Sequence, residues 1–245
     1  YVTAQRLADD VLDEQKDDIH ARFAPFELAA PAHFPEYAAV RELARSPFLT
    51  GNAVDLLVDG QQTYDSIAEG LARAERYILF QFYIIRDDDL GRRIGKLLSD
   101  RARAGVRVYL IYDEIGSYNF GSSRLCKQLR MTGVQVVHFN TTQGRSNRLQ
   151  LNFRNHRKVV VVDGKAAWIG GHNVGDEYLG RDPKVGKWRD THVKIEGPAA
   201  LAAQLSFIED YHWATGETPK LDWVPVTSGV SDQSVLIMPS GPADE

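Results

Sequence analysis

From residue 51 onward, short apolar runs alternate along the chain with segments in which apolar positions recur every three or four residues. Runs rich in β-branched and aromatic residues predict buried strands, and the wider spacing predicts helices. The predicted strands are 54–58, 77–85, 106–112, 134–139, 159–162 and 166–169, and the clearest predicted helices are 90–104 and 125–131. This alternation predicts an α/β fold with a mixed, largely parallel sheet and helices on both faces.

The first fifty residues follow a different pattern. Between residues 4 and 23, apolar side chains recur at roughly helical spacing among many charges, and residues 38–45 form a second short helical pattern. The first of these helices either packs on the core, which is the favoured interpretation, or continues from a membrane anchor. We therefore expect an N-terminal helical segment over 1–50 and a separate domain over 51–245.

Composition narrows the possible functions. The chain is 43% hydrophobic and 25% charged, which argues against extensive disorder, and its net charge of -4 provides no global attraction for nucleic acid. Any anion-binding site must therefore be local. Cys126 is the only cysteine, which excludes an internal disulfide and a thiolate zinc site, and no apolar run has the length of a membrane span.

The candidate chemistry follows a polar stretch, 140–151, that is predicted to be a loop. His156 and Lys158 lead into four consecutive valines, and Asp163 with the glycine after it predicts a hairpin turn to the next strand. In an extended strand, residues two apart point to the same side, so the imidazole and the ammonium are expected to lie together. A neutral imidazole can attack phosphorus while an ammonium neutralises the phosphate oxygens. Asp163 is expected to hold the strand in place rather than to contact substrate.

For an arbitrary His-x-Lys sequence, a solvated pair at a strand edge is the better interpretation. The complete pattern His-x-Lys-x4-Asp is more specific, because the composition predicts roughly 0.02 chance matches in a chain of this length. It is followed by Gly170 and Gly171, where glycine allows backbone to approach an anion, and by Asn173, whose amide can donate hydrogen bonds.

These residues resemble the HKD motif of the phospholipase D superfamily. The sequences Arg154–Lys158, Gly170–Gly180 and Trp188–His192 are similar to those of bacterial cardiolipin synthases in that superfamily. The resemblance extends over about residues 51–213, so it implies that the domain over 51–245 is one phospholipase D-like catalytic half.

The resemblance implies a covalent mechanism without a metal or other cofactor. One HKD histidine attacks the phosphodiester to form a phosphohistidine, and the histidine of a second HKD motif protonates the leaving alcohol. His156 would be one of these histidines, and Asp190 would orient it by a hydrogen bond to its other ring nitrogen. The implied catalytic residues are His156, Lys158, Asp163 and Asp190, and the implied substrate-binding residues are Asn173, Gly171, Arg154 and Asn155.

The chain departs from the superfamily because it carries one HKD motif, not two. The second motif would come from a C-terminal half that is absent here or from another copy of the chain across a two-fold axis. The chain starts without Met and also lacks the N-terminal membrane spans that are usual in cardiolipin synthases, so we expect it to be a piece of a longer protein. The expected location is the bacterial inner membrane, either as a peripheral protein or anchored by a segment that this chain lacks.

Three functions remain as alternatives. The leading one is transfer of a phosphatidyl group between two phosphatidylglycerol molecules to give cardiolipin. A phospholipase D or nuclease-type phosphodiesterase would use water as the acceptor. A catalytically silent domain would only bind anionic headgroups or a partner. Four arginines near the motif could bind either lipid headgroups or nucleic acid: Arg145, Arg148, Arg154 and Arg157.

Overall fold

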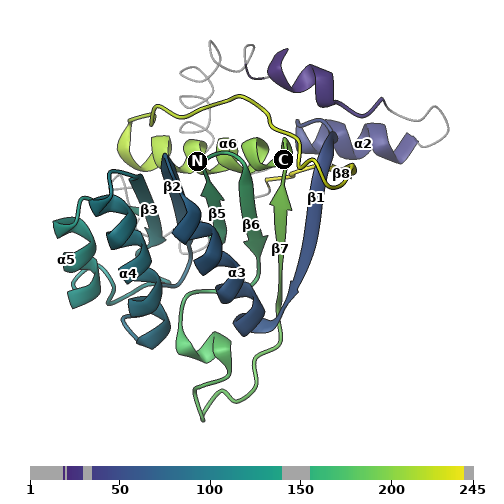
Figure 1. The fold of residues 1–245 in the computed structure, drawn as a ribbon. Helices are drawn as coiled ribbons and strands as arrows, with labels where there is room; N and C mark the ends of the chain where they lie inside the picture. Colours follow the sequence, from purple (N-terminus) through teal and green to yellow (C-terminus); the bar gives the residue numbers. More distant parts are fainter. Residues whose placement is uncertain (1–18, 20, 30–34, 140–154, 240–245) are drawn as a thin grey trace, which may run out of the picture. The chain divides into compact units, whose positions relative to one another are not determined.

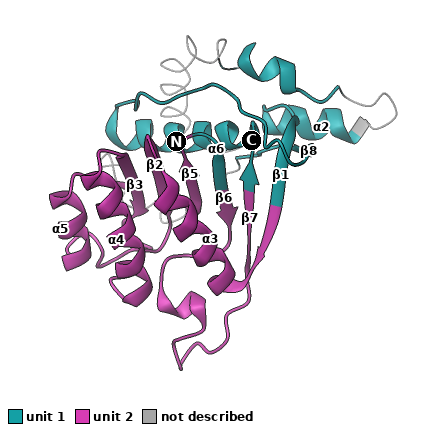
Figure 2. Cartoon of the chain, viewed as in Figure 1, with its two compact units in different colours: residues 1–54, 164–167, 195–245 teal, residues 55–163, 168–194 magenta. Residues whose placement is uncertain are grey.

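The computed structural model describes residues 19, 21–29, 35–139 and 155–239 (Figure 1). Contacts divide the chain into two units that are interleaved in sequence (Figure 2). Unit 1 comprises residues 1–54, 164–167 and 195–245, and unit 2 comprises residues 55–163 and 168–194. The domain boundary predicted near residue 50 stays a prediction. Most of the predicted first helix and all of the predicted loop at 140–151 lie outside the described residues.

The strands of unit 2 contain its most buried residues. β2 (Tyr77–Phe82) is buried along its whole length, and β3 (Arg107–Asp113) is buried after its first residue. β2 pairs in parallel with β3, which pairs in parallel with β4 (Gln135–Phe139). On the other side of β2, β5 (Val159–Val162) runs antiparallel.

The remaining strands make the sheet mixed. The strand order continues from β5 to β6 (Ala166–Gly170), β7 (Thr191–Glu196) and β1 (Leu49–Val58). The three-residue connection from β5 to β6 is one that only antiparallel neighbours can use. The predicted α/β fold with a mixed sheet is confirmed. The sheet is not largely parallel, however, because β5 runs antiparallel to both of its neighbours, β2 and β6.

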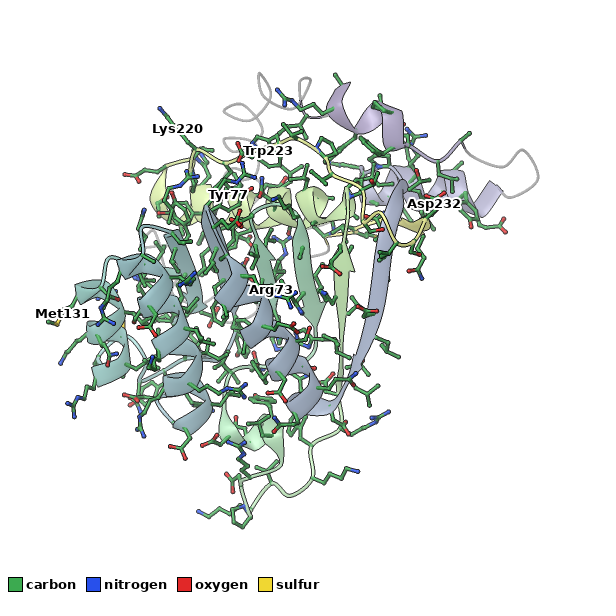
Figure 3. The ribbon with its side chains drawn as sticks, viewed as in Figure 1. Arg73, Tyr77, Met131, Lys220, Trp223 and Asp232 are labelled. Carbon is green, nitrogen blue, oxygen red and sulfur yellow. The ribbon has the colours of Figure 1, made fainter. Side chains whose placement is uncertain are left out.

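Three helices of unit 2 pack beside one another and against its strands (Figure 1). α3 (Asp59–Arg73) contacts β5, α4 (Asp89–Arg103) contacts β3, and α5 (Arg124–Met131) contacts β4. Side chains cap the last two helices, because Asp88 accepts from the N–H of Gly91 and Ser123 accepts from that of Cys126. Figure 3 shows Met131, which is 87% exposed, pointing away from the end of α5.

Unit 1 contains α2 (Pro35–Ala44), α6 (Ala199–Thr215), β8 (Gln233–Val235) and parts of β1, β6 and β7. β8 pairs antiparallel with β1. Buried Asn52 of β1 links this strand to β8 and α6. Its Nδ2 donates to the carbonyl oxygens of Leu49 and Gln233, and its Oδ1 accepts from the N–H of Ala199. α6 has apolar residues around its whole circumference and is largely buried, so its sequence lacks the polar face that marks an amphipathic helix.

Short segments complete the described structure. A 3₁₀ helix, η1 (Ala24–Phe26), lies in unit 1, and another, η3 (Asp176–Leu179), lies in unit 2. No helix in the described part of the chain combines the length and the apolar composition needed to cross a bilayer.

Candidate active site

The HKD motif lies in unit 2, with its histidine and lysine where β5 begins and β2 ends. In the antiparallel pairing of these strands, Val159 lies opposite Gln81. Residues just before Val159 therefore lie beside residues just after Gln81. This register brings His156 to Tyr83, and their ring centroids are 4.4 Å apart.

His156 and Lys158 lie together, as their spacing along the strand predicts. Nζ of Lys158 is 3.0 Å from Nδ1 of His156 and donates a hydrogen bond to the carbonyl oxygen of His156 at 2.6 Å. The imidazole is exposed, whereas Lys158 is only 5% exposed. An ammonium can only donate, so the charged lysine faces the lone pair of Nδ1, and a neutral ring then carries its proton on Nε2.

The surroundings of this pair favour a neutral imidazole next to a cation. Burial lowers the pKa of His156, the ammonium of Lys158 lowers it further, and the carboxylate of Asp113 opposes this shift. Burial lowers the pKa of Lys158 to about 8, although the carboxylates of Asp190 and Asp113 raise it. At neutral pH the imidazole is therefore mainly neutral and the ammonium mainly charged, which suits attack on a phosphodiester.

Asp113, the last residue of β3, is a member of this site to which the sequence interpretation gave no role. It is 2% exposed, and its Oδ1 accepts hydrogen bonds from the N–H groups of Ile115 and Gly116 at 2.9 and 2.8 Å. Its charge acts on both members of the His156–Lys158 pair. An acid at the carboxyl end of a parallel strand is the sequence signal for such a residue, because functional groups of open α/β sheets gather at that edge.

Asp190 lies close to the pair but does not make the expected contact. Its Oδ1 accepts from the N–H of Thr191 at 2.8 Å, and Nε1 of Trp188 is 3.5 Å from its Oδ2. Among the described residues, no hydrogen bond joins Asp190 to His156, whose Nδ1 faces Lys158. The hydrogen bond implied by the resemblance is therefore not formed, and Asp190 acts on the site through its charge, which raises the pKa of Lys158.

Gly171 and Asn173 are held by contacts within the protein. A Cβ on Gly171 would lie 2.1 Å from Oδ1 of Asp190, so glycine at this position makes room for a carboxylate instead of a substrate anion. Oδ1 of Asn173 accepts from the N–H of Ile84 at 3.0 Å, and its Nδ2 donates to the hydroxyl of Tyr178 at 3.1 Å. An amide nitrogen carries two hydrogens, so this network uses only one of them. Substrate binding by these two residues stays a prediction.

Asn155 has a buried hydrogen-bond donor that finds no partner within the described part of the chain. The residue is 6% exposed, its Oδ1 accepts from the N–H of Arg157 at 3.1 Å, and its Nδ2 makes no hydrogen bond to any of the described residues. An unpaired buried donor costs free energy that an acceptor on a ligand could recover. Arg154, predicted to bind substrate beside it, lies outside the described residues, as do Arg145 and Arg148.

Asp163 lies at the opposite end of β5 from the histidine. Its carboxylate accepts hydrogen bonds from the N–H groups of Glu75, Arg76 and Tyr77, each at 2.8 Å. Its φ of 55° is in the left-handed region, which aspartate tolerates better than most residues. These contacts fix the β5–β6 turn to the start of β2, which agrees with a structural rather than a chemical role for the third residue of the motif.

Sequence reasoning did not find a second pair of imidazoles, His172 and His192. Their Nδ1 atoms are 3.1 Å apart, and the residues are 0% and 1% exposed. Both Nε2 atoms are buried, and neither forms a hydrogen bond with a residue that the structure describes. Burial is the largest cause that lowers the pKa of each, and for His192 the pKa falls to about 3. Among the described residues, no group of three or more His, Cys, Asp or Glu side chains is arranged to hold a metal ion.

The HKD motif lies within a region that matches a known protein family. Residues 67–205 match the family model described as "Cardiolipin synthase, PLD-like domain". Cardiolipin synthase A of Pseudomonas fluorescens strain Pf-5 is 44% identical over 249 aligned residues, which take in 100% of this chain and 51% of that protein. The protein of the same name from Pseudomonas putida strain GB-1 is 43% identical, with the same coverage. The chain thus spans about half the length of the curated relatives it matches.

Solved structures match the fold at lower sequence identity. NucT from Helicobacter pylori has a TM-score of 0.52 and 17% identity, over 66% of this chain and 96% of NucT. Phosphatidylserine synthase from Haemophilus influenzae Rd KW20 has a TM-score of 0.53 and 17% identity, over 75% of this chain and 44% of that structure. At this identity the two structures support the fold alone. The family model and the two synthases also identify the family. This chain belongs to the family of cardiolipin synthase PLD-like domains.

Proposed function

We propose that this chain forms one half of a phosphatidyltransferase site that makes cardiolipin from two phosphatidylglycerol molecules. The observation that carries the proposal is the exposed imidazole of His156, which has the ammonium of Lys158 3.0 Å from its Nδ1. A nucleophile that substrate can reach is thereby placed next to a cation that can neutralise phosphate oxygens. The 44% identical relative, whose printed name is cardiolipin synthase A, supports the choice of substrate.

The reaction proceeds by two displacements at phosphorus. In the first, a ring nitrogen of His156 attacks the phosphate of phosphatidylglycerol, the bond to the headgroup glycerol breaks, and a second histidine protonates the departing glycerol. In the second, a hydroxyl of another phosphatidylglycerol attacks the phosphohistidine and gives its proton to the second histidine. Cardiolipin leaves, and both histidines return to their starting states. The order of the histidines can also be reversed, with His156 as the acid.

Lys158 has two roles in this scheme. Without substrate its Nζ contacts Nδ1 of His156, and an arriving phosphate competes for the same ammonium. When the ammonium turns to the phosphate oxygens, it stabilises the charge that develops during each displacement. The charges of Asp190 and Asp113 favour the protonated form of Lys158 and so oppose the effect of its burial.

The second histidine must come from outside the motif described here. The relatives are about twice as long as the aligned region, since it makes up 51% of cardiolipin synthase A. We propose that a second half of the same protein, or a second copy of the chain, supplies the second HKD motif. We also propose that the protein works at the bacterial inner membrane, peripherally or through an anchor, because both lipid substrates lie there.

The alternative with water as the acceptor retains the same nucleophile. A phospholipase would release phosphatidic acid, and a nuclease would cut a nucleic-acid backbone. The net charge of -4 argues against a nuclease, because tight binding of a phosphate backbone requires many cationic contacts. A domain that only binds headgroups would leave the exposed His156–Lys158 pair without a chemical role.

The test uses the full-length protein and vesicles that contain phosphatidylglycerol labelled in its headgroup glycerol. The proposal predicts labelled free glycerol and cardiolipin in equal amounts, with a phosphorylated histidine in acid-sensitive linkage after rapid denaturation. A plasmid-nicking assay and a phosphatidic-acid assay run on the same preparation. Nicking without cardiolipin formation would establish a nuclease, phosphatidic acid alone would establish a hydrolase, and headgroup binding without turnover would establish a silent domain.

A further inference from the structure

Tyr83, the first residue after β2, lies against both members of the catalytic pair. Its ring centroid is 4.4 Å from that of His156, with an angle of 42° between the ring planes. Nζ of Lys158 lies over the same ring, 5.4 Å from its centroid. One aromatic ring therefore contacts the imidazole and the ammonium together.

One edge of the Tyr83 ring, formed by Cδ2 and Cε2, lies against the turn that follows β3. A Cβ on Gly116 would lie 2.8 Å from Cδ2 and Cε2 of the tyrosine ring and 2.4 Å from its carbonyl oxygen. No side chain larger than hydrogen fits there without displacing Tyr83. Gly116 is itself held by the hydrogen bond from its N–H to Asp113 at 2.8 Å.

Ser117 fixes the backbone of the same tyrosine. Its hydroxyl donates to the carbonyl oxygen of Tyr83 at 2.9 Å and accepts from the N–H of Ile85 at 2.9 Å. Ser117 is 2% exposed, so water competes little for these bonds. The position of Tyr83 is therefore set by a turn that is more than thirty residues away in sequence.

The contact has two physical consequences for the catalytic pair. The face of an aromatic ring attracts a cation, so Tyr83 stabilises the charged form of Lys158 in a site where burial disfavours it. The ring also blocks one side of the imidazole and limits the rotation of His156 about its side-chain bonds. Both effects prepare the pair for a phosphate before it arrives, and a displacement of reacting groups by about 1 Å can cost about 100-fold in rate.

We propose that Tyr83 is a positioning residue that holds His156 and Lys158 in place for phosphoryl transfer. Gly116, by lacking a side chain, leaves the space that the ring of Tyr83 occupies. This inference rests on the proposed function, because positioning matters only where the pair performs chemistry. The contact itself is independent of which phosphodiester is the substrate.

The first experiment compares Tyr83→Leu and Tyr83→Phe in the full-length protein. Tyr83→Leu is expected to lower kcat for cardiolipin formation by about 10- to 100-fold with a smaller change in KM, because it loosens the pair and leaves the rest of the site in place. Tyr83→Phe retains the ring and is expected to stay within about threefold of the unchanged protein. Tyr118→Leu is the matched control, because Tyr118 is 79% exposed in the same post-β3 turn. Equal kcat for the Leu and Phe variants would overturn the proposal.

A second measurement does not depend on turnover. The ε-amino group of Lys158 is observed by NMR after isotopic labelling while the pH is raised. The titratable groups that act on it or are acted on by it are His156, His192, Asp113 and Asp190. Removal of the ring in Tyr83→Leu is expected to lower the midpoint of this titration, because the cation loses the attraction of the aromatic face. An unchanged midpoint would contradict the proposal even if kcat fell.

Two further outcomes separate this inference from the proposed function. If the protein forms no cardiolipin but the lysine midpoint still falls in Tyr83→Leu, the positioning role holds and the substrate assignment fails. If Tyr83→Leu does not fold, trifluorophenylalanine at position 83 replaces it, since this residue keeps the ring's shape and weakens the negative charge of its face. The midpoint must then fall relative to Tyr83→Phe, and equal midpoints would overturn the proposal.

Discussion

Two close pairs of basic side chains in the described part of unit 2 differ in their access to solvent. In the first, Nζ of Lys158 is 3.0 Å from Nδ1 of exposed His156. In the second, the Nδ1 atoms of His172 and His192 are 3.1 Å apart, and both residues are almost completely buried. Distance alone does not distinguish the two pairs.

The shift in pKa does not distinguish them either. The pKa is lowered for His156 and for both buried histidines, and the value of about 3 at His192 is a large departure from the usual 6.5. A search for the most perturbed histidine would therefore select the buried pair. Only His156 combines a lowered pKa with an imidazole that substrate can reach and a neighbouring cation, so access decides which pair can perform chemistry.

The largest effect is expected when the exposed pair loses its nucleophile. His156→Ala should lower the rate of cardiolipin formation by at least about a thousandfold, because either the nucleophile or the acid disappears. Thermal unfolding should change little, because the imidazole is exposed. Initial rates in vesicles and the unfolding midpoint test both expectations. Normal turnover in this variant would show that the exposed pair is not the active site.

Loss of the cation should lower the rate of transfer less than loss of the imidazole does. Lys158→Ala is expected to slow transfer by several hundred-fold, because one charge-stabilising donor is lost. In the unchanged protein the rate should decline as the pH rises through about 8, where Lys158 loses its proton. Lys158→Arg keeps its charge at that pH, so the alkaline decline should disappear even if the maximal rate is lower. Rates of both proteins measured across this pH range test this expectation. An identical alkaline decline in both would show that a group other than Lys158 causes it.

The buried pair should influence stability rather than chemistry. A histidine with a lower pKa in the folded protein than in the unfolded chain binds fewer protons when folded, so the free energy of unfolding should fall as the pH drops from 6.5 toward about 3. His192→Asn removes one such group and should reduce the loss of stability between about pH 7 and pH 4.5 by about 2 kcal/mol. Urea unfolding at the two pH values measures this difference.

The exposed residue His138 supplies the control for that experiment. His138→Asn should leave the acid loss of stability as it is in the unchanged protein. If the two variants behave alike, the acid sensitivity does not arise from the buried pair.

The smallest effect is expected at the far end of β5. Asp163→Asn should lower the free energy of unfolding by about 1–2 kcal/mol, because an amide cannot accept all three backbone hydrogen bonds that the carboxylate accepts. Transfer by the folded fraction should stay within a few-fold of normal, which urea unfolding and rate measurements test together. A loss of rate as large as that of Lys158→Ala would place Asp163 in the chemistry.

Much of this architecture could be predicted from patterns that are local in the sequence. Strands β2 to β6 appear within a few residues of their predicted positions, because β-branched runs and turn signals act over short distances. The proximity of His156 and Lys158 also follows from local geometry, since residues two apart in an extended chain share a side. α6 was missed because its apolar residues occur around the whole helix, so no polar face reveals its period.

The remainder of the site depended on contacts between distant segments. Tyr83 meets His156 through the pairing of β2 with β5, and His172 meets His192 across twenty residues. Asp190 contacts Thr191 and Trp188 instead of His156. By itself the sequence determined strands β2 to β6 and the motif, because these are set by neighbours along the chain. Tertiary structure alone decided which imidazole is exposed and which carboxylate lies beside the lysine, because burial and charge depend on what packs around a residue in space.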